Sequence, residues 1–228
     1  MHNTVIPDFA LQTDRRIRGE RRPLPLIGPK TAHVIVDLQV GFMAPGSVAE
    51  TPMNLRILPN VDRISAAVRR AGGLNVFLRY TFDPEWTGFF GRFEPAAVEP
   101  MKAAFSPGAE QHALWPGMDV QPGDLILDKT RFSALIPGTC DLQAELESRG
   151  IDTLIVTGCV SNCCCESTIR DAMQMNYSIV FVADGNAART DEDHNGAVAD
   201  LFGIFGCDVA AADEVIARLG ADNAAKAA

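Results

Sequence analysis

Short apolar runs alternate with longer amphipathic segments along most of the chain. Six runs have the length of buried strands: His33–Leu38, Asn75–Tyr80, Asp124–Leu127, Thr153–Thr157, Ser178–Ala183 and a weaker Cys207–Ala210. Helical periodicity is found in Leu55–Ala71, Cys140–Arg149, Cys163–Asn176, Asp191–Phe205 and the short Asp213–Leu219. Strands that alternate with helices are typical of βα units. We therefore predict an α/β fold with an open, doubly wound, six-stranded parallel sheet and helices on both faces.

The same pattern divides the chain into three parts. Residues 1–30 are rich in Pro and Arg without a sustained period, which predicts an N-terminal arm laid over the domain or onto a partner. Residues 31–220 form the predicted domain, and the Ala-rich tail 221–228 is expected to fray. Inside the domain, residues 81–123 lack a sustained period but are rich in aromatic side chains. A break of this length is usually functional, so it is either a lid or pocket wall, or a subunit interface.

Composition and charge narrow the range of partners. The formal net charge is -9, and the richest positive stretch, Arg15–Arg22, is most simply a solvated arm. An acidic surface repels polyphosphates, so we expect no nucleic-acid partner. No apolar run approaches the roughly 18 residues needed to span a bilayer, and the first 30 residues lack a secretion signal, so we expect a cytoplasmic protein without membrane contact.

Polar residues at the carboxyl ends of the predicted strands are the candidates for chemistry, because ligands bind at that edge of a parallel sheet. Asp37 ends the first strand, Lys129 follows the third, and Cys164 opens the helix after the fourth. Backbone amides and the helix dipole at a helix N-terminus favour a thiolate and an oxyanion. A nearby Lys129 ammonium would lower the thiol pKa further, and Asp37 could accept the proton. The sequence thus predicts a nucleophilic cysteine.

The cysteine run also raises two competing interpretations. Six cysteines is an even number, but four lie within Cys159–Cys165, where adjacent residues do not readily cross-link, so we expect reduced thiols. A zinc site is disfavoured because no CxxC pair recurs elsewhere. The four histidines offer no metal set either, and we expect neither a metal nor a cofactor. Ordinary packing is the expected role of Cys140, Cys159, Cys163, Cys165 and Cys207.

Three segments together resemble the signatures of the isochorismatase-like cysteine hydrolases. They are Val36-Asp37-Leu38-Gln39 with Phe42, the stretch from Asp128 to Ala134 (DKTRFSA), and the stretch from Gly158 to Thr168 (GCVSNCCCEST). The resemblance implies a Rossmann-like sheet and an Asp37–Lys129–Cys164 triad that attacks an amide-type carbonyl through a thioester. It places the nucleophile at Cys164 and implies a cis Val160–Ser161 peptide, with the amides of Ser161 and Cys164 as the oxyanion hole.

The motifs look closest to the branch that hydrolyses ureidoacrylate and other carbamoyl amides. The Asp-x-His metal motif of nicotinamidases is replaced by Arg79-Tyr80-Thr81-Phe82-Asp83, which counts against a metal. We expect a small-molecule substrate to contact Gln39, Phe42, Tyr80, Phe82, Arg131, Val160 and Asn162. Arg131 is the candidate for a substrate carboxylate, with a structural ion pair as its alternative.

Two other functions remain open at this stage. One is an isochorismatase that cleaves a vinyl ether without a nucleophilic cysteine. The other is a non-catalytic binding protein that retains the fold, although all three triad positions are intact. The resemblance also implies a homo-oligomer, either a dimer or a tetramer.

Overall fold

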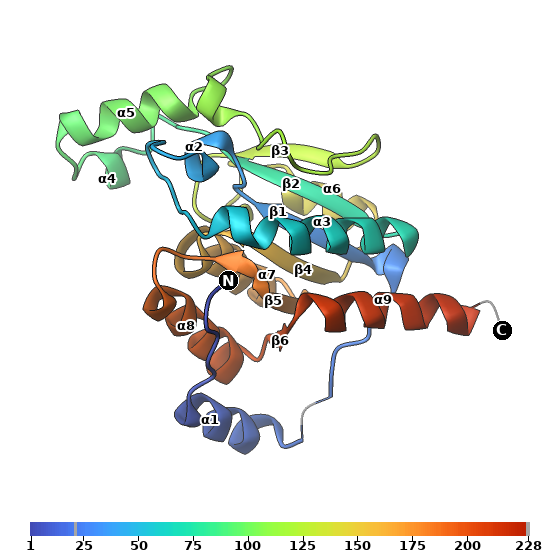
Figure 1. The fold of residues 1–228 in the computed structure, drawn as a ribbon. Coiled ribbons are helices and arrows are strands. Elements are labelled where there is room, and N and C mark those ends of the chain that lie inside the picture. The colour runs from blue at the N-terminus through green and yellow to red at the C-terminus, as the bar shows by residue number, and fades with distance from the viewer. Residues whose placement is uncertain (21, 227–228) are drawn as a thin grey trace.

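A six-stranded, all-parallel sheet forms the centre of the computed structural model, which describes residues 1–20 and 22–226, the last five by their backbone alone (Figure 1). The strands are β1 (Thr31–Val36), β2 (Leu74–Tyr80), β3 (Leu125–Lys129), β4 (Thr153–Cys159), β5 (Ser178–Ala187) and β6 (Asp208–Ala210). Their spatial order is β3-β2-β1-β4-β5-β6. This is the doubly wound order, in which successive strands are added in one direction from β1 to β3 and in the opposite direction from β4 to β6. The predicted fold class is confirmed.

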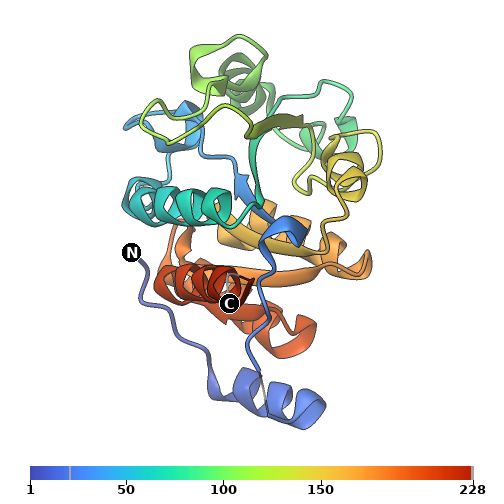
Figure 2. The ribbon, with the colours of Figure 1, turned by 90° about the vertical axis from the view of Figure 1, so that its right-hand side faces the viewer.

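Helices cover both faces of this sheet (Figure 2). α3 (Asn54–Arg70) and α9 (Ala212–Lys226) lie on one face, and α6 (Leu142–Ser148), α7 (Glu166–Gln174) and α8 (Asp191–Asp200) lie on the other. β1 is buried at all six positions, because a parallel strand in the middle of such a sheet has no solvent-facing side. Alternate residues therefore enter different cores, with Val34 packed against the α6–α7 side and Ile35 against α3.

The predicted N-terminal arm contains a helix that the sequence pattern missed. α1 (Asp8–Arg18) packs on a π-helical turn, η4 (Leu201–Phe205), and buries only Ala10 and Asp14. A β-carbon at Gly203 would lie 3.2 Å from Ala10 Cα, so small residues allow the close approach. Arg18 donates to the carbonyls of Gly203 and Ile204, which corrects the expectation that Arg15–Arg22 is solvated throughout. The helix was missed because its buried stripe is narrow and its sequence is mostly polar.

The aromatic segment 81–123 also contains helices, contrary to the expected absence of regular structure. α4 (Thr87–Phe90), α5 (Pro95–Phe105) and a 3₁₀ turn, η2 (Glu110–His112), extend beyond the sheet (Figure 1). These pieces are too short for a sustained period, and α5 carries a proline at its first position and another inside. Further short elements are η1 (Gly28–Lys30) and α2 (Val40–Met43).

Two predicted helices are divided. The predicted helix Cys163–Asn176 begins with a π-helical turn, η3 (Ser161–Cys165), and the predicted helix Asp191–Phe205 ends in η4. Most of the predicted frayed tail, 221–228, lies outside the residues whose side chains are described, so that expectation stays a prediction.

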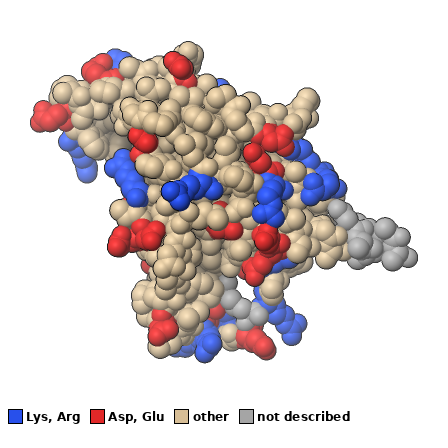
Figure 3. Space-filling model, in the orientation of Figure 1, with Lys and Arg blue, Asp and Glu red and all other residues tan. Residues whose placement is uncertain are grey.

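Acidic and basic side chains are interspersed on the face shown in Figure 3 rather than gathered into one basic patch. Within the described residues, none of the helices is long and apolar enough to cross a membrane.

Candidate active site

Asp37 and Lys129 form an ion pair at the carboxyl edge of the sheet. Asp37 directly follows β1, and Lys129 is the last residue of β3, two strands away. Asp37 Oδ2 lies 2.8 Å from Lys129 Nζ, and both side chains are fully buried. The Lys129 ammonium also donates to the carbonyl of Arg131 at 3.1 Å. The sheet thus brings together two of the three predicted catalytic side chains, which lie 92 positions apart in the chain.

The carboxylate of Asp37 has unused hydrogen-bonding capacity. Neither of its oxygens accepts a well-aligned hydrogen bond from the described part of the chain, although Lys129 is in contact. The backbone of Asp37 has φ 54°, a left-handed conformation that few non-glycine residues adopt and that often marks functional sites. Burial raises the pKa of Asp37, while the charge of Lys129 opposes this rise. A carboxylate in this state is well placed to accept a proton.

The turn that carries the cysteines begins with a close approach between β4 and β1. Gly158 has φ +118°, and a β-carbon there would lie 2.1 Å from the carbonyl oxygen of Val36. Only glycine fits at position 158. Its neighbour on β1, Val36, immediately precedes Asp37. The Cys159–Val160 peptide bond is cis. This corrects the expected cis Val160–Ser161 bond by one residue.

The Cys164 thiol lies in η3, within hydrogen-bonding range of both Asp37 and Lys129. Cys164 is 7% exposed to solvent. The neighbouring Cys163 thiol and burial raise the pKa of Cys164, and the charge of Lys129 only opposes this rise. This corrects the expectation of a lowered thiol pKa, because the thiol is buried. Burial lowers the pKa of Lys129, but the charge of Asp37 acts the other way and outweighs it, so Lys129 stays protonated. The three predicted catalytic residues are therefore adjacent.

The surroundings of the other cysteines differ from those of Cys164. Cys159 and Cys165 are buried, and burial raises the pKa of both thiols. Cys163 is partly exposed at the edge of a cavity. All six cysteines are free in this structure, and their reduced state stays a prediction. No cluster of three or more Cys, His, Asp or Glu side chains suited to a metal occurs among the described residues.

A cavity of about 330 Å³ opens beside the cysteine turn. Three predicted substrate-binding residues line it: Phe42, Val160 and Asn162. Cys163 lines it too, so the cavity reaches the residue adjacent to the nucleophile candidate. Sequence reasoning missed Arg189 and Asp193 on its wall, because they follow β5, whose carboxyl end carried no recognised motif. Asp193 accepts a hydrogen bond from Asn162 at 3.1 Å.

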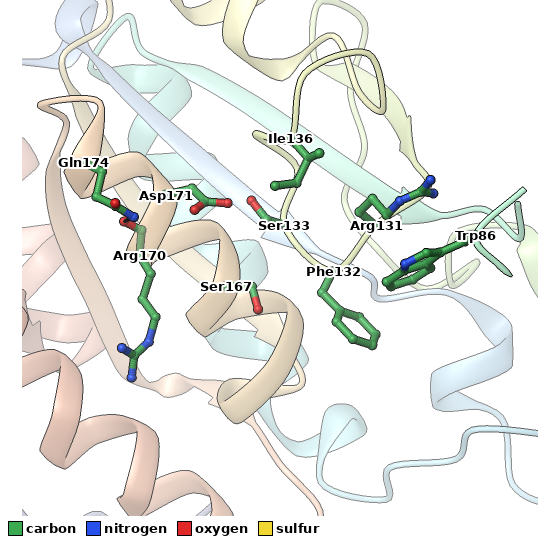
Figure 4. Close-up of a pocket in the computed structure, with 9 residues that line it drawn as sticks. All are labelled: Trp86, Arg131, Phe132, Ser133, Ile136, Ser167, Arg170, Asp171 and Gln174. Carbon is green, nitrogen blue, oxygen red and sulfur yellow. Dashed lines mark hydrogen bonds between the residues drawn. The ribbon is translucent and has the colours of Figure 1, made fainter. Parts of the chain in front are cut away.

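A second cavity, of about 510 Å³, lies on the α7 side of the triad (Figure 4). Trp86 from the aromatic segment forms part of its wall, next to Phe132 and Arg131. The Arg131 guanidinium stacks on Trp86, 4.9 Å from the ring centroid, and pairs with Asp83 at 2.8 Å. The alternative interpretation of Arg131 as one half of a structural ion pair is therefore present in the structure. A part of the segment 81–123 acts as a pocket wall.

The remaining predicted substrate contacts are more deeply buried. Gln39 is fully buried, and its amide donates to the carbonyls of Tyr80 and His112 and accepts from the Tyr80 N–H. These bonds use its amide to fix the end of β2, which leaves it little capacity for a substrate. Tyr80 packs with its ring 5.5 Å from Lys129 Nζ, and Phe82 packs on Phe90. Gln39 therefore has a structural role in holding the backbone of Tyr80 and His112.

Ser161, the predicted oxyanion-hole residue, lies at the start of η3 and is fully buried. Its hydroxyl pairs with Nδ1 of His194 at 2.9 Å, so the side chain is held from the α8 side. The participation of the Ser161 and Cys164 amides in an oxyanion hole stays a prediction.

The fold agrees with comparisons to known proteins. A model of the isochorismatase domain matches residues 31–214. The chain therefore belongs to the isochorismatase family and is a hydrolase.

Particular relatives refine this picture. The ureidoacrylate amidohydrolase RutB of Variovorax paradoxus (strain S110) is 31% identical over 179 residues, which cover 71% of this chain and 70% of RutB. A cysteine hydrolase structure from Pseudomonas syringae pv. phaseolicola 1448A superposes with a TM-score of 0.76 at 24% identity, covering 89% of this chain and 97% of that one. The N-carbamoylsarcosine amidase structure from Thermoplasma acidophilum gives 0.66 at 24% identity, over 81% and 97% of the two chains.

Proposed function

We propose that this hydrolase cleaves the C–N bond of a small carbamoyl, ureido or related linear amide, with Cys164 as the nucleophile. The observation that carries the proposal is the contact of Cys164 with the fully buried Asp37–Lys129 pair. The similarity to a ureidoacrylate amidohydrolase supports the substrate class.

The proposed reaction has two stages. Asp37 accepts the Cys164 thiol proton, and the sulfur attacks the carbonyl carbon of the substrate. Lys129 stabilises the negative charge that develops on the sulfur as the proton leaves. The C–N bond then breaks, and Asp37 returns the proton to the departing ammonia or amine. In the second stage Asp37 takes a proton from water, whose oxygen attacks the thioester. The product acid leaves, and the proton returns to the Cys164 sulfur.

The unused hydrogen-bonding capacity of Asp37 suits this double role. A carboxylate that was saturated by backbone donors would have a low pKa and would be a poor base. Burial instead raises the pKa of Asp37 toward the working range of a general base. Lys129, which stays charged, keeps a positive charge beside the developing thiolate. The proposed chemistry requires no metal.

The test combines an assay with mass spectrometry of the intact protein. Ammonia release is measured for a panel of ureido acids, carbamoyl amino acids and aliphatic amides, and the protein is quenched during turnover. We expect a substrate-dependent acyl adduct on Cys164, and loss of activity in Cys164→Ala. Cys163→Ala is the matched control, since it removes the neighbouring thiol but leaves the proposed nucleophile.

Two outcomes would contradict the proposal. Full amide hydrolysis by Cys164→Ala would show that the thiol is not the nucleophile. Cleavage of the vinyl ether of isochorismate by both the wild type and Cys164→Ala, with no activity on any amide, would establish the alternative reaction.

A further inference from the structure

We propose that the N-terminal segment His2–Val5 is a positioning strap for the nucleophile turn, acting through His194 on Ser161. This segment precedes the domain in the sequence, yet it lies against α8 beside the candidate active site. The proposal rests on the proposed function for its catalytic consequence. The contacts that carry it form a chain from His2 to the turn that contains Cys164.

The first link is His2, whose side chain is only 1% exposed. Its Nε2 accepts a hydrogen bond from the backbone N–H of Ala188 at 2.9 Å. Its Nδ1 therefore carries the hydrogen and donates to Asp191 Oδ1 at 2.7 Å. The two bonds fix the ring between the end of β5 and the start of α8.

The second link is the stack between His2 and His194. The ring centroids are 4.5 Å apart and the planes are inclined by 16°. His194 itself is fully buried, and burial lowers its pKa to about 4, with a smaller contribution from His2. The ring is neutral at ordinary pH, so one nitrogen donates and the other accepts.

The third link joins both nitrogens of His194 to hydroxyl groups. Nε2 lies 3.2 Å from Thr4 Oγ1 in the strap, and Nδ1 lies 2.9 Å from Ser161 Oγ in η3. A hydroxyl can both donate and accept, so each bond can form with either tautomer. Thr4 on one side and His2 on the ring face leave His194 with a single orientation. That orientation holds the Ser161 hydroxyl from the α8 side.

The strap is itself held along α8 by backbone contacts. The Val5 N–H donates to Asn195 Oδ1 at 2.9 Å, and Asn195 Nδ2 donates to the carbonyl of Asn3 at 3.1 Å. These bonds set the register that places Thr4 opposite His194. His194 and Thr4 touch no reacting atom, so they are positioning residues and not catalytic ones. Their effect reaches the chemistry through the position of the Ser161 backbone.

The decisive variants are Thr4→Val, which keeps the shape but removes the hydroxyl, and Thr4→Ser, which restores it. We expect Thr4→Val to lower kcat about tenfold with KM within about twofold, because it would displace the Ser161 amide, the predicted oxyanion donor, and such a displacement costs rate rather than binding. Thr4→Ser should recover most of the rate. Thr13→Val on α1 makes the same change without touching His194, and it should leave kcat unchanged.

A substrate-free measurement separates the strap from the proposed function. Hydrogen exchange followed by mass spectrometry reports on peptides that cover Gly158–Glu166. We expect His2→Ala and Thr4→Val to raise exchange there at least about threefold, and Thr13→Val to leave it unchanged. If the wild type hydrolyses none of the amides, the proposed function fails, while this exchange result still decides whether the strap holds the turn. Wild-type kcat and wild-type exchange in Thr4→Val would overturn the strap proposal.

Discussion

The two ends of the sheet each hold a charged cluster, partly buried at the amino end and fully buried at the carboxyl end. The carboxylates of the two clusters differ in how fully they are hydrogen bonded. At the amino end, Arg69 binds both oxygens of Asp124, which also accept from Asn75 and from the Gln121 N–H. At the carboxyl end, the oxygens of Asp37 lie near Lys129, the Cys164 thiol and the Tyr80 N–H but accept no well-aligned hydrogen bond from any described residue. The carboxylate of Asp124 is therefore saturated with hydrogen bonds, and that of Asp37 is not.

This difference indicates that the amino-end cluster has a structural role and the carboxyl-end cluster a catalytic one. A saturated carboxylate has no capacity left for a proton or a substrate group, and hydrogen bonds to it hold its pKa down. The pKa of Asp124 is accordingly lowered, although burial acts against this, whereas the pKa of Asp37 is raised. Buried charges that lack their full set of partners are costly, so their presence at one edge indicates a function.

The largest expected effect comes from removing charge at the carboxyl end. Asp37→Asn should reduce kcat by about a thousandfold or more, since both stages of the proposed reaction use the carboxylate as base. It should also reduce the free energy of unfolding by about 3 kcal/mol, because Lys129 is left buried without its partner. Ammonia-release assays and urea unfolding measure the two effects.

A double variant tests whether these two effects are separable. Asp37→Asn combined with Lys129→Met removes both buried charges, so we expect most of the stability to return while activity stays lost. Recovery of activity in the double variant would contradict the proposal that Asp37 acts as the base in addition to neutralising Lys129.

The next effect is expected at the amino end. Arg69→Met leaves Asp124 with an incomplete set of partners, and we expect a loss of about 2 kcal/mol in the free energy of unfolding. The value of kcat per folded molecule should not change, because the cluster lies at the opposite end of β2 and β3. Urea unfolding and active-site titration with iodoacetamide make the measurement. A tenfold fall in kcat per titrated site would show that the two clusters are coupled.

A smaller effect is expected from pH. His33, in the same amino-end region, bonds Ser65 and Thr157, and burial lowers its pKa from 6.5 to about 3. Between these two values the unfolded chain binds the proton and the folded chain does not, so stability falls as pH falls below about 6.5. From pH 7 to pH 5.5 the contribution of His33 should be about 1 kcal/mol. Urea unfolding at the two pH values measures how much the free energy of unfolding falls. For His33→Gln this fall should be smaller than for the wild type by that amount, and an equal fall in both proteins would contradict the prediction.

The smallest expected effect concerns the cavity beside Cys163. Arg189 lines it and, within the described ranges, forms no ion pair, in contrast to Arg69 and Arg131. We expect Arg189→Gln to raise KM about threefold to fivefold for substrates that carry a carboxylate, and to leave KM for neutral amides unchanged, because Asp193 on the same wall offsets part of the charge. Arg131→Gln is the comparison. A larger rise in KM for Arg131→Gln would indicate that Arg131, and not Arg189, binds the substrate carboxylate.

The sequence predicted the sheet and the triad for a physical reason. Asp37, Lys129 and Cys164 each stand at the end of an apolar run, and parallel strands bring those ends to one edge. The position of the cis bond could not be derived, because a shift by one residue leaves the pattern of apolar and polar residues unchanged. Arg189 and the strap could not be found from spacing either. They depend on which loops and termini pack together, and His2 and His194 are 192 positions apart.

The contact of Gly158 with the Val36 carbonyl has a consequence for redesigning the enzyme. A side chain at position 158 would push β1 and β4 apart between the residue that precedes the proposed base and the turn that holds the proposed nucleophile. Gly88, in the aromatic segment, has open space where a β-carbon would lie. A library that varies every position should therefore retain only glycine at 158 and accept many residues at 88. New substrate ranges are best sought by diversifying the aromatic segment, while the β1–β4 junction is kept fixed.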